Sequence, residues 1–262
     1  MMLMNKIQKT LTFLSKEEAQ DVYDRVMSLQ NEWILRIPGD LALHTLGIGT
    51  FPDKANGSPV YFEKVESNNK MMWENFSDIY EKILDFFNKE LGPTRYAPGL
   101  ALPIFHIFSN KLEDRKEIIE IPEINKQFKI HHDNGHIDQE DYFGNEDLEH
   151  ITYTLAISLP KRGAGLFVYG EENVDGECSP DSQVYLDLLK TPYDQGEVNE
   201  MTLKNNNWAD PKFIEYYPGS LVYQIGDVYH QIIIGLDINS HDDRITFQGI
   251  GVKKDGEWLL YY

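Results

Sequence analysis

The richest set of potential metal ligands lies at residues 128–138, in the segment FKIHHDNGHID. In an extended strand alternate side chains share a face, so His131 and Asp133 would point to one side and His132 to the other. An imidazole and a carboxylate placed side by side can bind one metal ion. We predict that the third ligand is His230, which opens a strand in YPGSLVYQIGDVYHQII. Two histidines and one carboxylate would then cover one side of the ion and leave its other positions open.

A second His-x-Asp pair competes for the same role, because His136 and Asp138 lie five residues further on. We favour His131 and Asp133 because the β-rich run FKIHHD ends there, whereas Gly135 places the second histidine in a turn. The sequence alone leaves both pairs open as the metal-binding frame.

Residues near these ligands are candidates for substrate binding. We name His136 and Asp138, together with His106 in the apolar run IFHIF, although a packed strand histidine is the alternative for His106. Asp138 also begins an acidic cluster with Glu140 and Asp141, which could pair with the ammonium group of an amino acid or amine. A solvated acidic loop in an acidic protein explains this cluster equally well.

A cation lies 14 residues past His230, at Arg244 in DDRITFQGIGV. In a strand, Arg244 and Thr246 would share one face, with Ile245 and Phe247 on the other. A guanidinium offers a planar fork that matches a carboxylate, and it stays charged when buried. Arg244 and the Thr246 hydroxyl therefore form a plausible seat for the far carboxylate of a dicarboxylic co-substrate.

The order His131-x-Asp133, His230 and Arg244-x-Thr246 resembles the signature of the Fe(II)/2-oxoglutarate-dependent dioxygenases. The flanking segments ITYTLAISLPKRGAGLF and EYYPGSLVYQIGDVYH are similar to those that follow the His-x-Asp pair and precede the distal histidine in this family. The segments LHTLGIGTF and LALPIFHIF also resemble a branch that modifies free amino acids and other small metabolites.

This resemblance covers about residues 128–252 and implies a double-stranded β-helix, a cupin-like jelly roll backed by N-terminal helices. It implies that the two histidines and the aspartate bind Fe(II), and that 2-oxoglutarate and O₂ are co-substrates. The implied reaction is hydroxylation of an unactivated C–H bond of a small molecule, a free amino acid or related metabolite. Decarboxylation of 2-oxoglutarate to succinate and CO₂ would accompany it.

Two other functions are compatible with the same residues. A peptidyl or protein hydroxylase would use the same chemistry but need an open groove, whereas the long polar segment 170–217 suggests a covered, small pocket. A non-catalytic jelly-roll metal-binding protein would not need an anchor such as Arg244. A cupin of that kind would normally have His-x-His followed by a glutamate, a pattern that HHDNGH lacks.

The composition excludes several other classes of protein. The chain has 262 residues, 41% of them hydrophobic and 26% charged, as is usual for a globular protein. A formal net charge of −19 disfavours binding to nucleic acid. No apolar run is long enough to span a membrane, and a single cysteine, Cys178, gives no support for secretion, so we expect a cytoplasmic protein. No pattern in the sequence specifies an oligomeric state.

The elements that must position these residues can be predicted from periodicity. The pattern Ser-x-x-Glu at residues 15–18 and the apolar spacing after it predict a helix over 16–31, and an apolar stripe predicts a second helix over 76–91. Short β-rich runs predict strands at 102–108, 117–121, 128–132, 151–159, 165–169, 220–224, 229–234, 244–252 and 258–261.

These elements predict a mainly β fold with N-terminal helices. We expect one domain over residues 1–262, with a helical support region at 1–96 and a jelly-roll core at 97–262. The segment 170–217 would be a lid-like insertion between two strands of that core.

Overall fold

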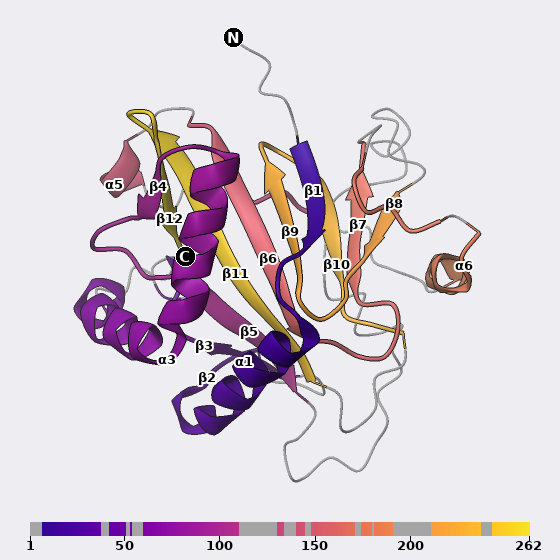
Figure 1. Ribbon diagram of the computed structural model, residues 1–262, viewed down its shortest axis with the longest axis horizontal. Helices are drawn as coiled ribbons and strands as arrows, with labels where there is room; N and C mark the ends of the chain where they lie inside the picture. The colour runs from indigo at the N-terminus through magenta and orange to yellow at the C-terminus, as the bar shows by residue number, and fades with distance from the viewer. Residues whose placement is uncertain are drawn as a thin grey trace.

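Most of the chain that the structure describes is folded into antiparallel β-strands, with two long helices packed against them (Figure 1). The structure, a computed structural model, describes residues 7–37, 42–50, 53, 60–109, 130–133, 140–144, 148–170, 174–179, 181–190, 211–236 and 243–262.

A large sheet forms the centre of the described fold. Its strands lie side by side in the order β1 (Ile7–Thr12), β9 (Ser220–Ile225), β6 (His150–Ser158), β11 (Asp243–Lys254), β5 (Ile104–Ser109), β3 (Ala42–Leu46) and β2 (Ile34–Ile37). The long strand β11 pairs with β6 along one edge. Along its other edge it pairs first with β5 and then with β12 (Glu257–Tyr261), which also pairs with β4 (Thr94–Tyr96).

A small sheet consists of β10 (Tyr229–Ile233), β7 (Gly165–Tyr169) and β8 (Lys212–Glu215), which run next to one another in Figure 1. Gly165 lets β7 and β8 approach closely, because a Cβ atom there would collide with the backbone oxygen of Ile214. On the other side of β10, the chain at His131 forms an isolated bridge to His230. The small sheet is thus extended by the segment that carries the first predicted ligands.

Two amphipathic helices cover one face of the large sheet. Helix α1 (Lys16–Ser28) begins at Ser15, where the serine and glutamate side chains of the predicted capping box both bond to the backbone. Helix α3 (Val60–Glu90) has a kink at Phe76, whose φ is −139°. Shorter helical segments are η1 (Gln30–Glu32), α5 (Glu140–Phe143) and α6 (Gln183–Lys190).

The central strands separate an apolar face from a polar one. Phe105 of β5 and Phe247 of β11 join the main core under the two long helices. The next residues along these strands, His106 and Gln248, instead line a cavity on the opposite face, as does Arg244 of β11. Strand alternation, with a period of two, therefore places the functional side chains between the large and the small sheet.

The predicted fold class, mainly β with N-terminal helices, is confirmed. Five predicted strands correspond closely to β5, β6, β7, β9 and β10, and the strands predicted at the C-terminus to β11 and β12. The predicted strand 117–121 and the start of 128–132 lie outside the described residues. No helix in the described part of the chain is long and apolar enough to span a membrane.

The N-terminal third is less helical than the sequence indicated. Residues 1–96, predicted as helical support, also contribute β1, β2, β3 and β4 to the large sheet. These strands are three to six residues long and contain several polar residues, so their pattern is weak. Of the predicted insertion 170–217, the described parts hold α6 and β8, and β8 belongs to the small sheet.

Candidate metal centre

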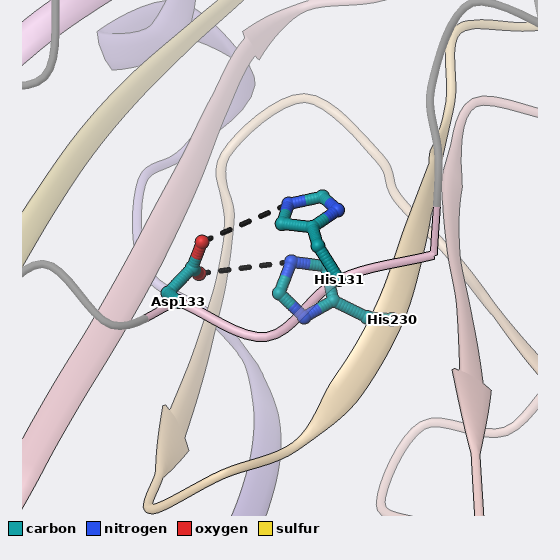
Figure 2. A group of neighbouring side chains, drawn as sticks. All are labelled: His131, Asp133 and His230. Atoms are coloured by element: carbon teal, nitrogen blue, oxygen red, sulfur yellow. Dashed lines mark ion pairs between the residues drawn. The ribbon is translucent and has the colours of Figure 1, made fainter. Parts of the chain in front are cut away.

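His131, Asp133 and His230 meet at one point, and their ligand atoms all lie within 4.8 Å of one another. The Asp133 carboxylate faces both rings, with His131 Nε2 at 3.7 Å and His230 Nε2 at 3.6 Å from its oxygens (Figure 2). The two imidazole centroids are 4.5 Å apart. The structure thus brings together the three residues that the sequence singled out as ligands.

The backbone fixes the two histidines against each other. The His131 N–H donates to the His230 carbonyl at 3.0 Å, and the His230 N–H donates to the His131 carbonyl at 2.8 Å. This reciprocal pair is possible because β10 and the segment at His131 are both extended and antiparallel. Asp133, two residues further along, then falls on the same side as His131, as strand alternation predicts.

The environment of His230 keeps its ring neutral and correctly oriented. Its Nδ1 lies 2.9 Å from the Val228 carbonyl, and because a carbonyl only accepts, Nδ1 is the protonated nitrogen. Burial lowers the pKa of His230, against the opposing effect of Asp133. The Nε2 lone pair is therefore free to face the Asp133 carboxylate, as a metal ligand requires.

These three side chains fit a divalent transition metal. The distances of 3.6 and 3.7 Å between imidazole nitrogens and carboxylate oxygens are longer than hydrogen bonds. A lone pair opposite a carboxylate is repulsive unless a cation lies between them. Two imidazoles and one carboxylate form the donor set typical of non-haem Fe(II) sites with open coordination positions.

Arg244 is the second notable group of the site. Its side chain is 1% exposed, and its Nε and Nη1 have no hydrogen-bond partner among the described residues. The guanidinium lies 5.5 Å from the centroid of the Phe108 ring. Burial lowers the pKa of Arg244 to about 10, so the group is still a cation at neutral pH. A buried guanidinium with two such nitrogens is costly and favours the binding of an anion.

One cavity connects Arg244 to the three ligands. It has a volume of about 270 Å³ and lies between the two sheets. Its walls include His131, Asp133, His230 and Arg244, and further polar side chains come from the large sheet, from the residue after β8 and from the C-terminal segment. These further polar residues are His106, Thr152, Tyr153, Thr154, Tyr216, Gln224, Gln248 and Tyr262.

His106 lines this cavity together with Tyr262, a residue that the sequence analysis missed. The Tyr262 hydroxyl lies 2.7 Å from His106 Nε2. Burial, with added repulsion from Arg244 and Arg36, lowers the pKa of His106 to about 3. Burial also raises the pKa of Tyr262, so both members of this pair are neutral at physiological pH. No motif marked Tyr262, because its place depends on how β12 returns beside β11 and β4.

The remaining predicted site residues are Thr246, His136 and Asp138. Thr246 is fully buried, and its hydroxyl accepts a hydrogen bond from Gln248 Nε2 at 3.0 Å. Among the described residues, Arg244 and Gln248 line the cavity and Thr246 does not. Tyr216, which reasoning from sequence also missed, lines it near Arg244. His136 and Asp138 lie outside the described residues, so the structure places only one of the two His-x-Asp pairs.

The chain is similar to known proteins in structure but not detectably in sequence. No protein-family model matches the sequence, and no curated protein shows detectable similarity to it. The crystal structure of an N-substituted L-amino acid dioxygenase from Burkholderia ambifaria, in complex with alpha-ketoglutarate, matches with a TM-score of 0.54 and 11% identity. The match covers 97% of this chain and 85% of that one.

A prolyl-4-hydroxylase from Pseudomonas putida also matches, with a TM-score of 0.33 and 10% identity over 93% of this chain and 89% of that one. The assignment of the fold rests on the Burkholderia ambifaria dioxygenase, whose TM-score exceeds 0.5. It agrees with the two-sheet arrangement that encloses the cavity. The chain therefore has the fold of that dioxygenase, the jelly roll that the sequence predicted.

Proposed function

We propose that the chain is an Fe(II)/2-oxoglutarate-dependent oxygenase that hydroxylates a small molecule. The observation that carries this proposal is the convergence of His131, Asp133 and His230 in the cavity that also contains the buried Arg244, whose Nε and Nη1 have no hydrogen-bond partner among the described residues. A metal-binding protein without catalysis has no use for a buried guanidinium on the wall of its metal site. A dicarboxylic co-substrate accounts for both features at once.

Each residue has a separate task in this proposal. His131, Asp133 and His230 hold the metal, and Arg244 binds the far carboxylate of 2-oxoglutarate by charge-assisted hydrogen bonds. The nearby Tyr216 and Gln248 complete the polar wall, while Thr246 acts through its bond to Gln248. Bound Fe(II) supplies the activation of O₂, in which one oxygen atom enters succinate as CO₂ leaves and the other enters the C–H bond of the substrate.

The protein contributes binding and the exclusion of water. Arg244 is buried at one end of the cavity, whereas the side chains of His131 and Asp133 are 40% and 35% exposed, so the far carboxylate of the co-substrate would be the part best shielded from bulk solvent. Neutral His230 and buried Arg244 keep their roles without a change of protonation near neutral pH. His230 and Arg244 lie on the strands β10 and β11, which fixes their positions precisely.

A small substrate, of the size of a free amino acid or related metabolite, fits the described cavity. Its volume of about 270 Å³ lies near the lower end of the range for ligand pockets and must also hold the co-substrate. The structurally similar protein is by its name an amino acid dioxygenase. We assign His106 and Tyr262 to substrate contact, because this neutral pair lines the cavity near Asp133. His136 and Asp138 remain candidates from sequence.

The release of succinate from 2-oxoglutarate in the presence of Fe(II) and O₂ tests this function. Mutation of a residue that only hydrogen-bonds to a metal ligand typically lowers activity by roughly 10- to 100-fold. We expect Asp133→Ala, which removes a ligand itself, to lower succinate release by at least this factor. Asp85→Ala is the matched control, because Asp85 is exposed on α3 and packs against no part of the cavity. Equal succinate release from the wild type and Asp133→Ala would refute the proposal.

The substrate can be sought by mass spectrometry. A panel of free amino acids and their N-substituted derivatives is incubated with the enzyme, Fe(II) and 2-oxoglutarate, and products are screened for the gain of one oxygen. A parallel panel of peptides covers the alternative of a peptidyl hydroxylase. We expect oxygen gain among the small molecules, and gain only among peptides would replace our assignment of the substrate class.

A further inference from the structure

Asp227 links the two chain segments that carry the proposed ligands. It lies in the turn between β9 and β10, three residues before His230. Its Oδ1 is 3.1 Å from Nδ1 of His132 and 3.5 Å from Nε2 of His150. His132 is the residue between His131 and Asp133 in the chain. One carboxylate therefore connects the turn before one ligand to the residue that separates the other two.

His132 is held from two directions. Because a carboxylate can only accept, His132 Nδ1 donates the hydrogen bond to Asp227. The His132 ring also packs on Tyr229, with centroids 4.7 Å apart. In this extended segment His132 alternates with His131 and Asp133, so its contacts hold the segment from the side opposite the metal site and set the direction of the two ligands.

The turn that bears Asp227 is itself fixed by the backbone. The Gly226 N–H donates to the His150 carbonyl at 3.0 Å, and the Val228 N–H donates to the Gly226 carbonyl at 3.0 Å. The Val228 carbonyl in turn accepts from His230 Nδ1 at 2.9 Å. The turn thus orients His230 through the Val228 carbonyl and binds His132 through the Asp227 side chain.

We propose that Asp227 is a positioning residue, which holds the His131–Asp133 segment in register with His230 and thereby strengthens metal binding. The inference rests on the proposed metal site. Asp227 has a side chain that is 53% exposed, so its ion pairs contribute little to global stability. Its effect should be on the geometry of the ligands, where outer partners are worth roughly 10- to 100-fold in metal affinity.

The test is a titration of the metal-free protein with Mn²⁺, followed by calorimetry, without 2-oxoglutarate. We compare the wild type with Asp227→Ala and with Asp227→Asn, whose amide oxygen still accepts from His132. Glu149→Ala is the matched control: it removes one negative charge next to His150, and its carboxylate pairs with Lys253 at 3.3 Å. Melting temperatures of the metal-free proteins monitor folding.

We expect Asp227→Ala to bind Mn²⁺ about 10-fold more weakly, with a melting temperature close to that of the wild type. Asp227→Asn and Glu149→Ala should stay within about threefold of the wild type, because they keep the hydrogen bond. Unchanged affinity in Asp227→Ala overturns the inference. Equal losses in Asp227→Ala and Asp227→Asn also overturn it, since charge alone would then explain the effect.

A second variant keeps the test independent of any local unfolding in Asp227→Ala. His132→Phe retains the packing on Tyr229 but loses the bond to Asp227. It should weaken Mn²⁺ binding as Asp227→Ala does, and the double variant should lose no more than either single one. Additive losses contradict a shared contact. Failure of the wild type to bind Mn²⁺ would instead count against the proposed function itself.

Discussion

Arg244 and His230 belong to different sheets and line the same cavity. Arg244 lies on β11 at the centre of the large sheet, and His230 lies on β10 of the small sheet. The space between the sheets thus has a cation on one wall and a neutral imidazole on the other. A molecule that bound both the metal and Arg244 would have to span this gap, and we propose 2-oxoglutarate for this role.

Removal of the buried cation should separate stability from function. Arg244→Met replaces a guanidinium with two unpartnered nitrogens by an apolar chain, and such changes are often neutral or stabilising. We expect the variant to resist urea at least as well as the wild type. Its KM for 2-oxoglutarate should rise by about 30-fold or more, since a buried ionic partner is lost.

The control for Arg244→Met is Arg95→Met. Arg95 is half-exposed and pairs with Glu257 at 3.0 Å on the surface. Its removal should leave the KM for 2-oxoglutarate unchanged. An unchanged KM in Arg244→Met would show that the co-substrate binds elsewhere.

The buried His106 should make the protein less stable in acid. Because burial lowers its pKa to about 3 in the folded state, only the unfolded chain binds a proton there between about pH 6.5 and 3. Stability is therefore lost as the pH falls through this window. His106→Gln cannot titrate. Between about pH 7.5 and about pH 5, its free energy of unfolding should therefore fall by about 2 kcal/mol less than that of the wild type. Urea unfolding of the metal-free proteins at both pH values measures this, and equal losses would contradict it.

The Tyr262 hydroxyl should matter for the substrate and not for the co-substrate. Tyr262→Phe leaves His106 Nε2 without its partner at 2.7 Å. We expect the KM for the substrate that undergoes hydroxylation to rise by about 10-fold, because an unmade buried hydrogen bond usually costs about this much in binding. The KM for 2-oxoglutarate should be unchanged. Tyr217→Phe is the control, because Tyr217 is exposed and bonds to Thr12 outside the cavity. A rise in the KM for 2-oxoglutarate alone would move Tyr262 to the co-substrate.

The small sheet should not tolerate a side chain at Gly165. An alanine there would collide with the Ile214 backbone on β8, which cannot move without breaking the pairing of the two strands. We expect Gly165→Ala to lower the free energy of unfolding by about 1–3 kcal/mol. Gly99→Asn is the control, since a Cβ at Gly99 meets no atom within 4 Å and asparagine tolerates positive φ. Equal stability of Gly165→Ala and the wild type would contradict the close approach.

The sequence predicted best the strands that line the cavity. β6, β7, β9 and β10 are continuous β-rich runs with glycine or proline nearby, so their ends were clear. β8 has only four residues, KFIE, within a polar segment, and was missed. Helix α3 begins 16 residues before the predicted apolar stripe, because its first half is largely polar and is held by tertiary packing of Tyr61 and Met72.

For the site, the motif residues could be predicted from the sequence, but the other residues that line the cavity could not. His131, Asp133, His230 and Arg244 have diagnostic types and order, whereas the place of Tyr262 is set by long-range strand pairing. Thr246 shows the limit of strand alternation as a guide. The register of β11 with β6 is irregular between Ile245 and Thr246, and the Thr246 hydroxyl accepts a hydrogen bond from Gln248.

The most direct test of the account is a crystal structure of the protein with Mn²⁺ and 2-oxoglutarate, prepared without Fe(II). We predict one ion, identified by its anomalous scattering, bound by His131, Asp133 and His230, with the far carboxylate of 2-oxoglutarate at Arg244. An ion bound by His136 and Asp138, or a co-substrate remote from Arg244, would contradict it.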